Sequence, residues 1–412
     1  MNRRQFVRGS LVTSLGGLGS GSLFVSQRHL GAERSKVPAS PNEAATKHRV
    51  YAHLLDPREH PDYTRRHVRP PNWDTFEGRT HLATLRDFKI EDGRIVHYVE
   101  KIEKYTQKHE LGDVLWLMYP ILYAENLGDL ADEIKRRKLF LFDIWAYVPG
   151  SGPGGIWQQF QPPAGVFELL ESKLGERWLG MDNGEQDGRY VGGYASQFYP
   201  SSADRLEQYL NFQRHFERLT DELGNKMSTL VSLNFGHYFL KEGVYTLIGA
   251  ETGQALPNGQ VFYVFIRGAG KQYGVPWFGN ASVWNRWGWK EYGPEQHDGG
   301  VTGGPTKGTS LSLMKRLMYS HILYNSMLAG FESSWFYAQP GAAIAAEPPA
   351  EGDELSPVGL MQRAAGRWLR EVGQPGPMIT TMALMLDFFA GWTFPRHLYT
   401  SDVYRVWGNL PY

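Results

Sequence analysis

Three glutamates stand at the ends of apolar runs, where a strand would give way to a loop. Glu185 follows Trp178–Met181 after a polar turn, Glu251 closes Tyr245–Ala250, and Glu332 interrupts an apolar and aromatic stretch. Two carboxyl groups together can supply a proton donor and a second group that attacks carbon or activates water. We therefore take these three residues as the candidate catalytic groups.

Glu332 is the first choice for the nucleophile, because a lone carboxylate among apolar residues is costly unless it is paired or functional. Glu185 is the first choice for the acid/base, and Glu251 is the reserve for either role. The competing interpretations are an ion pair for Glu332, a polar turn or a bond to Arg189 for Glu185, and a helix-capping acid for Glu251. A carboxylate separation of roughly 5 Å would give retention and roughly 6.5 to 9.5 Å inversion, so both outcomes stay open.

Aromatic side chains are concentrated in a long glycine-rich loop between the second and third glutamates. Trp284, Trp287 and Trp289 fall within six residues of that loop, interleaved with Asn285 and Arg286. Flat rings of this kind offer apolar faces on which sugar rings stack. Aromatic and polar residues of this loop and of the strand ends are the predicted substrate contacts: Asp143, Trp145, Asp182, Asn183, Asn234, His237, Trp277, Asn280, Trp284, Trp287 and Trp335.

The elements that would position these residues alternate between short β-rich runs and amphipathic helical stretches. The predicted strands are Val50–Leu55, Val114–Tyr119, Leu139–Trp145, Arg177–Met181, Ser228–Asn234, Tyr245–Gly249, Val275–Gly279 and Gly330–Phe336. The predicted helices are Gly93–Lys108, Ala203–Leu223, Gln260–Tyr273, Thr309–Met327 and Ser356–Val372.

Eight parallel strands with intervening helices are best satisfied by closure into a (β/α)8 TIM barrel, which is an α/β fold without exposed sheet edges. Barrel enzymes place their sites at the C-terminal ends of the strands, where the polar and aromatic residues fall here. A doubly wound open sheet is the alternative. The sequence after the first predicted strand lacks the glycine-rich dinucleotide fingerprint of that fold.

The chain from 49 to 390 resembles a glycoside-hydrolase barrel followed by the first strand of a flavodoxin-like domain, as in some bacterial β-galactosidases. Asn183-Gly184-Glu185 is similar to the Asn-Glu pair that ends the fourth strand of the large retaining clan, although Gly184 is inserted. Met382–Asp387 and the following Gly391-Trp392 are similar to the opening strand and turn of the second domain. The resemblance implies a glycosidase with Glu185 as acid/base.

Composition excludes several other classes. Lys plus Arg and Asp plus Glu both number 43, so there is no net positive field for nucleic acid. The chain contains no cysteine, which removes disulfides, thiol nucleophiles and cysteine-based metal sites. The sequence contains no His-Glu-x-x-His motif and no Gly-x-Ser-x-Gly motif. We expect a carbohydrate partner, no metal, no cofactor and no membrane span.

The N-terminus is similar to a twin-arginine export signal, with Arg3-Arg4 ahead of a weakly apolar stretch. The predicted organisation is a signal at 1–30, a linker at 31–48, the barrel at 49–374, and a second domain or C-terminal extension at 375–412 that includes the apolar run Met378–Phe388. The expected location is therefore periplasmic or extracellular, reached by a route that carries folded proteins.

Two other functions fit the same sequence. A polysaccharide lyase would need a base such as Tyr190 or His237 and an arginine such as Arg267 beside a uronic acid. A non-catalytic barrel would bind a glycan without cleaving it. Separate replacement of Glu185 and Glu332 distinguishes the three functions. Hydrolysis depends on both carboxylates, lyase activity should survive the loss of at least one, and simple binding depends on neither.

Overall fold

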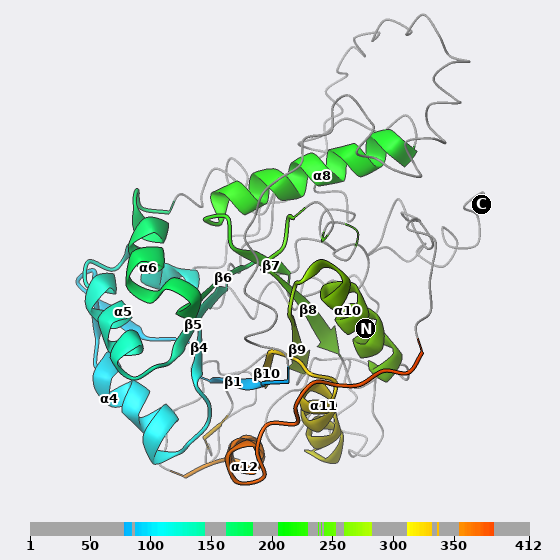
Figure 1. Cartoon of the computed structure of the whole chain (residues 1–412). Coiled ribbons are helices and arrows are strands. Elements are labelled where there is room, and N and C mark those ends of the chain that lie inside the picture. The colour runs from blue at the N-terminus through cyan, green and yellow to red at the C-terminus, as the bar shows by residue number, and fades with distance from the viewer. Residues whose placement is uncertain are drawn as a thin grey trace, which may run out of the picture.

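Eight parallel strands close into a barrel, and helices cover its outer side (Figure 1). The computed structural model describes residues 78–84, 87–144, 162–183, 205–229, 243–252, 259–281, 311–331, 336–337 and 354–382, together with Tyr238 and Leu240. This is the (β/α)8 fold that the sequence predicts, and its closure leaves no barrel strand with an open edge.

The barrel strands follow one another around the ring in chain order, and the last pairs with the first. They are β1 (His81–Thr84), β4 (Val114–Met118), β5 (Phe140–Ile144), β6 (Trp178–Asp182), β7 (Met227–Thr229), β8 (Leu247–Thr252), β9 (Trp277–Ala281) and β10 (Leu328–Phe331). The helices are α4 (Tyr98–Glu103), α5 (Leu127–Arg136), α6 (Val166–Leu174), α8 (Arg205–Glu222), α10 (Gly259–Tyr273), α11 (Leu311–Leu323) and α12 (Pro357–Glu371). Shorter elements are the hairpin β2 (Lys89–Glu91) and β3 (Arg94–Val96), the π-helix η2 (Lys104–Lys108), and the 3-10 turns η3 (Tyr119–Tyr123) and η5 (Gly175–Arg177).

The first barrel position corrects the sequence prediction. β1, at His81–Thr84, pairs with both β10 and β4 and so occupies the place expected for 50–55. Residues 50–55 lie outside the described part of the chain. A run of four residues that begins with His and ends with Thr has little apolar pattern of its own. Its neighbours in the ring, rather than its composition, make it a strand.

The helix predictions are confirmed at 203–223, 260–273, 309–327 and 356–372, with ends shifted by a few residues. Ser356 caps α12, since its Oγ accepts a hydrogen bond from the Gly359 N–H at 3.1 Å. The first residues of the helix predicted at 93–108 form the turn and second strand of the hairpin β2–β3 instead, and the helix starts at Tyr98. Asp92 and Gly93 both have positive φ, 47° and 74°, which is the two-residue turn that an Asp-Gly pair favours.

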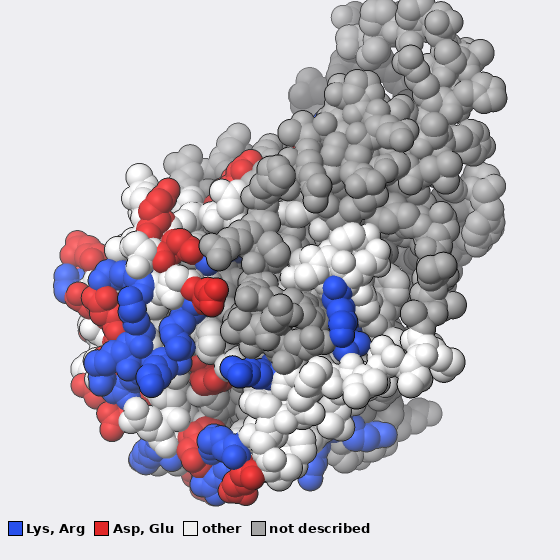
Figure 2. Space-filling model, viewed as in Figure 1, with Lys and Arg blue, Asp and Glu red and all other residues white. Residues whose placement is uncertain are grey.

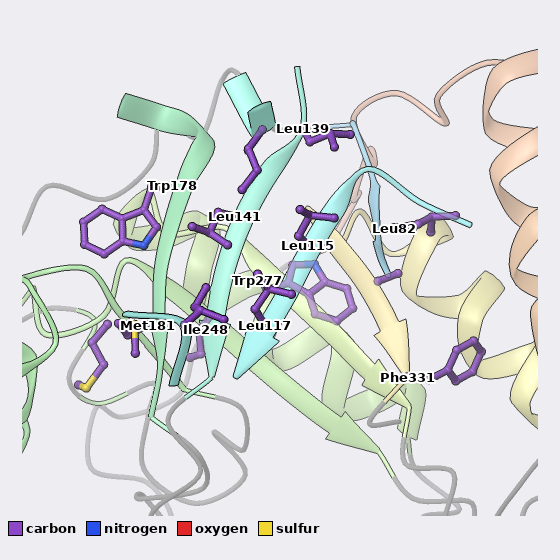
Figure 3. Packing of buried hydrophobic residues seen from close by; sticks show 14 of the residues in the cluster. Leu82, Leu115, Leu117, Leu139, Leu141, Trp178, Met181, Ile248, Trp277 and Phe331 are labelled. Carbon is purple, nitrogen blue, oxygen red and sulfur yellow. The ribbon is translucent and has the colours of Figure 1, made fainter. Parts of the chain in front are cut away.

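Buried apolar residues form two clusters, separated by the wall of strands. The outer cluster contains strand residues such as Leu115, Leu117 and Leu141 (Figure 3). It also contains residues of the surrounding helices. The inner cluster draws almost wholly on strand residues and therefore fills the barrel: Ala83, Val114, Trp116, Phe142, Leu179, Leu247, Phe278, Met327 and Leu328. Because side chains alternate along a strand, cluster membership shows which face each residue occupies.

A segment that follows α12 crosses the N-terminal end of the barrel. The Gln374 side chain accepts from the Thr80 N–H at 2.8 Å and donates to the Thr80 carbonyl at 3.3 Å. Gly376 N–H donates to the Gly78 carbonyl at 3.3 Å. In the apolar run 378–388, residues 378–382 contribute no strand, and residues 383–388 lie outside the described part of the chain. In the part of the chain that is described, no helix is long and apolar enough to cross a bilayer.

Candidate active site at the barrel mouth

Among the polar residues that face the barrel interior, Asn280 and Asp182 lie near the C-terminal ends of their strands. Asn280 lies two residues after Phe278 of the inner cluster and so shares its inward face. Asp182 ends β6 and pairs with Ser228, which pairs with Leu247 of the same cluster. Both Asp182 and Asn280 are fully buried. We call these two residues the interior polar layer.

An aromatic floor lies below this layer. The Trp116 ring stacks on Phe142 at 5.8 Å between centroids, and both meet Phe278 edge-on, at 6.1 and 5.5 Å. These three rings belong to the inner cluster, which fills the barrel beneath the polar layer. Sequence reasoning missed Trp116, because the run Val114–Met118 is apolar throughout and gives no alternation that would show which face the ring occupies.

The Asn280 amide is the most informative feature of the layer. Within the described residues, neither its oxygen nor its nitrogen has a hydrogen-bond partner, and the side chain is fully buried. An unsatisfied buried polar group costs about 1–3 kcal/mol. Such a cost is tolerated where a ligand completes the hydrogen bonds.

The backbone of Glu251 lies beside Asn280, because the two residues pair across β8 and β9. On the other side Asn280 pairs with Gly330 of β10. β8 runs to Thr252, so Glu251 belongs to the strand. The helix-capping interpretation required Glu251 to lie in the turn after the strand. One predicted catalytic residue and one predicted contact residue are therefore neighbours in the barrel wall.

Asp143 faces away from the interior, which corrects its predicted role in sugar binding. It pairs with Leu117 and Met181, both in the outer cluster, and lies two residues after Leu141 of that cluster. Burial raises the pKa of the Asp143 carboxyl well above its usual range, and the nearby Trp178 indole lowers it only in part. The indole does not reach hydrogen-bond geometry with that carboxyl. Asp143 therefore belongs to the strand–helix layer.

The position of Trp277 also does not fit its predicted role as a sugar contact. Its ring is fully buried in the outer layer and stacks on Tyr263 at 5.5 Å. Its indole N–H donates to the Tyr324 carbonyl at 3.1 Å. An isolated tryptophan before a glycine-rich loop looks like a sugar platform in sequence, but β9 continues through Ala281 and turns this ring toward α10 and α11.

His321 of α11 completes that buried aromatic group. Its Nε2 lies 2.8 Å from the Tyr263 hydroxyl, and burial lowers the pKa of the imidazole to about 3. The ring lies directly against Gly279, where an added Cβ would stand 2.2 Å from the His321 Cγ. We call Tyr263, Trp277 and His321 the buried aromatic group. It supports β9 from outside, directly behind Asn280.

The remaining predicted residues divide into two sets. Asn183 is fully buried, and its backbone N–H donates to the Ser228 carbonyl at 2.9 Å, which holds the end of β6 against β7. Eight residues lie outside the described part of the chain, and their roles stay predictions: Trp145, Glu185, Asn234, His237, Trp284, Trp287, Glu332 and Trp335. Among the described residues no group of His, Asp and Glu could hold a metal ion.

No protein-family model and no curated protein matches this sequence. Solved structures that resemble the fold include GH5_18 from Streptomyces cattleya in complex with GlcNAc, at 11% identity over 73% of this chain and 82% of that one, with a TM-score of 0.38. PbGH5A, a glycoside hydrolase family 5 enzyme from Prevotella bryantii B14, is 8% identical over 74% and 99%, with a TM-score of 0.40. A GH113 β-1,4-mannanase is 10% identical over 71% and 99%, with a TM-score of 0.35.

Proposed function

We propose that the protein is a glycoside hydrolase that binds a neutral glycan at the C-terminal mouth of its barrel. The observation that carries the proposal is the interior polar layer, in which the unsatisfied Asn280 amide faces inward above an aromatic floor. An amide offers one acceptor and two donors, which match the hydroxyl groups of a sugar.

A neutral substrate is favoured by the charges of the barrel wall. None of the eight barrel strands contains a lysine or an arginine, and Asp182 supplies an inward carboxyl group. A uronic acid would meet no cation from these strands and would lie near a group of its own charge. This argues for hydrolysis of a neutral glycan and against the lyase alternative.

Arg267, the arginine considered for a lyase, contacts a segment at the N-terminal end of the barrel. Arg267 of α10 donates through Nη2 to the Met378 carbonyl at 3.0 Å, in the segment that crosses the N-terminal end of the barrel. Barrel enzymes carry their chemistry at the opposite end. Arg267 thus acts as a structural residue.

The proposed chemistry uses two carboxyl groups. Glu185 donates a proton to the leaving oxygen, and Glu332 attacks the anomeric carbon or activates water, with Glu251 in reserve for either. Asp182 and Asn280 hold sugar hydroxyls beneath the cleaved bond. Glu185→Gln and Glu332→Gln should each lower the rate on a neutral polysaccharide by about 100- to 10,000-fold. A rate retained in Glu332→Gln would rule out that nucleophile, and binding indifferent to both would indicate a non-catalytic barrel.

Asn280→Leu gives a test that does not depend on the catalytic assignment. Leucine has a similar shape and removes the unsatisfied amide, so the variant should unfold at a higher temperature while it binds glycan more weakly. Calorimetric unfolding and titration with neutral oligosaccharides measure both quantities. An amide that serves only the fold would give the opposite result, a less stable protein with unchanged glycan binding. Asp143→Asn, a polar change in the outer layer, is the matched control for binding.

We also propose that the protein is exported by the twin-arginine route. The support is Arg3-Arg4 with the apolar stretch after it, and a chain without cysteine, which can fold before export. An Arg3→Lys, Arg4→Lys double variant should accumulate in the cytoplasm. Normal export of that variant would contradict the proposal.

A further inference from the structure

The Asn280 amide has no hydrogen bond within the described residues that would orient it. Its place is therefore set by the backbone of β9 and by packing. Pairing with Glu251 of β8 and Gly330 of β10 fixes the height of Asn280 in the barrel wall. Hydrogen bonds between strands act within the sheet, so the layer outside β9 decides how far its backbone lies from the barrel axis.

The outer side of β9 is occupied at Gly279 by the imidazole of His321 on α11. An added Cβ at Gly279 would stand 2.2 Å from the ring Cγ and 2.5 Å from both Cδ2 and Nδ1, so the ring lies directly against the strand backbone. Side chains alternate along a strand, and Asn280, the next residue, faces inward. The imidazole and the Asn280 amide therefore lie on opposite sides of one short backbone segment.

The imidazole is itself held from two sides. Its Nε2 lies 2.8 Å from the Tyr263 hydroxyl of α10, and the Tyr263 ring meets it edge-on at 4.7 Å and 80°. The Trp277 ring of β9 meets it edge-on at 6.1 Å and 88°. The chain just after α11 is bound to the same strand, because the Trp277 indole donates to the Tyr324 carbonyl at 3.1 Å and the Trp277 carbonyl accepts from the Met327 N–H at 2.8 Å. A displacement of the imidazole would therefore move β9.

We infer that His321 is a positioning residue for the Asn280 amide: its ring, held by Tyr263, sets how deeply the amide reaches into the barrel. This role rests on the proposed function, in which the amide holds a sugar hydroxyl. Loss of the ring would leave a cavity behind Gly279, into which a close-packed wall relaxes in part. β9 would move toward that cavity, and the amide would withdraw from the barrel axis and bind glycan less tightly.

A double-mutant cycle on glycan binding gives the first test. His321→Ala should weaken binding of a neutral oligosaccharide about tenfold in the otherwise unaltered protein, and by less than about twofold in Asn280→Leu, where the amide is already gone. His321→Gln keeps a hydrogen-bonding group toward Tyr263 and should restore most of the affinity. The same loss in both backgrounds would mean that His321 serves stability alone, and would overturn the inference. Leu170→Ala, a buried change in α6, is the matched control and should leave the affinity unchanged. Titrations are compared at a temperature at which circular dichroism shows all variants folded.

The amide can also be observed without a glycan, by nuclear magnetic resonance of protein that carries isotopically labelled asparagine. The side-chain N–H signals of Asn280 are those that Asn280→Leu lacks. His321→Ala should shift or broaden these signals, whereas His321→Gln should leave them close to their original positions. Neither variant keeps the imidazole, so a change caused only by the lost ring would appear equally in both. Equal Asn280 signals in the two His321 variants would overturn the inference. If the signals differ but the unaltered protein binds no glycan, the positioning role stands and the proposed function fails.

Discussion

The helix layers on the two halves of the barrel are held in different ways. Over α4, α5 and α6, acidic and basic side chains alternate across the surface (Figure 2). Glu133 lies between Arg136 and Arg137, and the hydrogen bond from Arg136 is the main reason that its pKa falls to about 2. Two further pairs, Lys173–Asp132 and Lys226–Glu171, tie neighbouring elements together at the surface.

On the opposite half, α10 and α11 contain no acidic residue and so supply no carboxylate for such pairs. Here the buried aromatic group joins α10, β9 and α11, with His321 set against Gly279. Exposed ion pairs such as Lys173–Asp132 contribute about 0–1 kcal/mol, whereas overpacking a close-packed core costs about 1–3 kcal/mol. Substitutions in the second half should therefore destabilise the protein more than substitutions in the first half. Asn280 lies in the second half.

The largest effect is expected at Gly279. A methyl group there would stand 2.2 Å from the His321 ring carbon, and the strand and helix would have to separate to admit it. Gly279→Ala should lower the free energy of unfolding by about 3 kcal/mol in urea denaturation. Gly268→Ala on α10 is the control, because nothing lies within 4 Å of its added Cβ, and helix propensity should stabilise it by up to about 1 kcal/mol. Equal stability of the two variants would show that His321 can move aside.

His321 should make the protein sensitive to acid. The unfolded imidazole binds a proton below its ordinary pKa of 6.5, whereas the folded one resists protonation down to about 3. The unfolded state thus holds more protons across this window, so the free energy of unfolding falls as pH drops from 6.5 to 3, by at most about 4 kcal/mol. Stability measured against pH should lose this slope in His321→Gln. Replacement of the exposed His97 by Asn should leave it intact.

Asp143 should act in the opposite direction. Its pKa is raised in the folded state, so the folded protein holds more protons than the unfolded one above the ordinary value of 3.8. The stability that the neutral carboxyl supports is complete below 3.8 and is lost as pH rises through the raised pKa. Asp143→Asn should therefore raise the melting temperature at pH 7.5 and change it little at pH 3.5. A variant that is less stable at both values would mean that the carboxyl has a structural partner.

The smallest effect is expected in the charged half. Lys173 pairs with Asp132, and the two side chains are 29% and 59% exposed. Lys173→Ala should change the free energy of unfolding by less than about 0.5 kcal/mol, and added salt should remove most of the difference. If Lys173→Ala lowered the free energy of unfolding as much as Gly279→Ala, the proposed difference between the two halves would be wrong.

Much of the architecture followed from local pattern. Seven of the eight predicted strands overlap observed barrel strands, because apolar β-rich runs bounded by turn residues need only local information. β1 was missed because the evidence for it is its pairing with β4 and β10, which is not local. The hairpin at Asp92-Gly93 was missed although its turn signal was present in the sequence.

The sequence by itself determined the alternation of strands and helices, the closed barrel, and the presence of polar residues at strand ends. It could not determine which of those residues face inward. Asp143 and Asp182 look alike in sequence, since each stands near the end of a short apolar run. The register shift between β5 and β6 and the positive φ of Gly180, 102°, set which side chains of β6 face the interior, with Leu179 in the inner cluster and Met181 in the outer. The register of neighbouring strands thus turned Asp182 into the barrel and Asp143 out of it, and that register is decided by the tertiary structure.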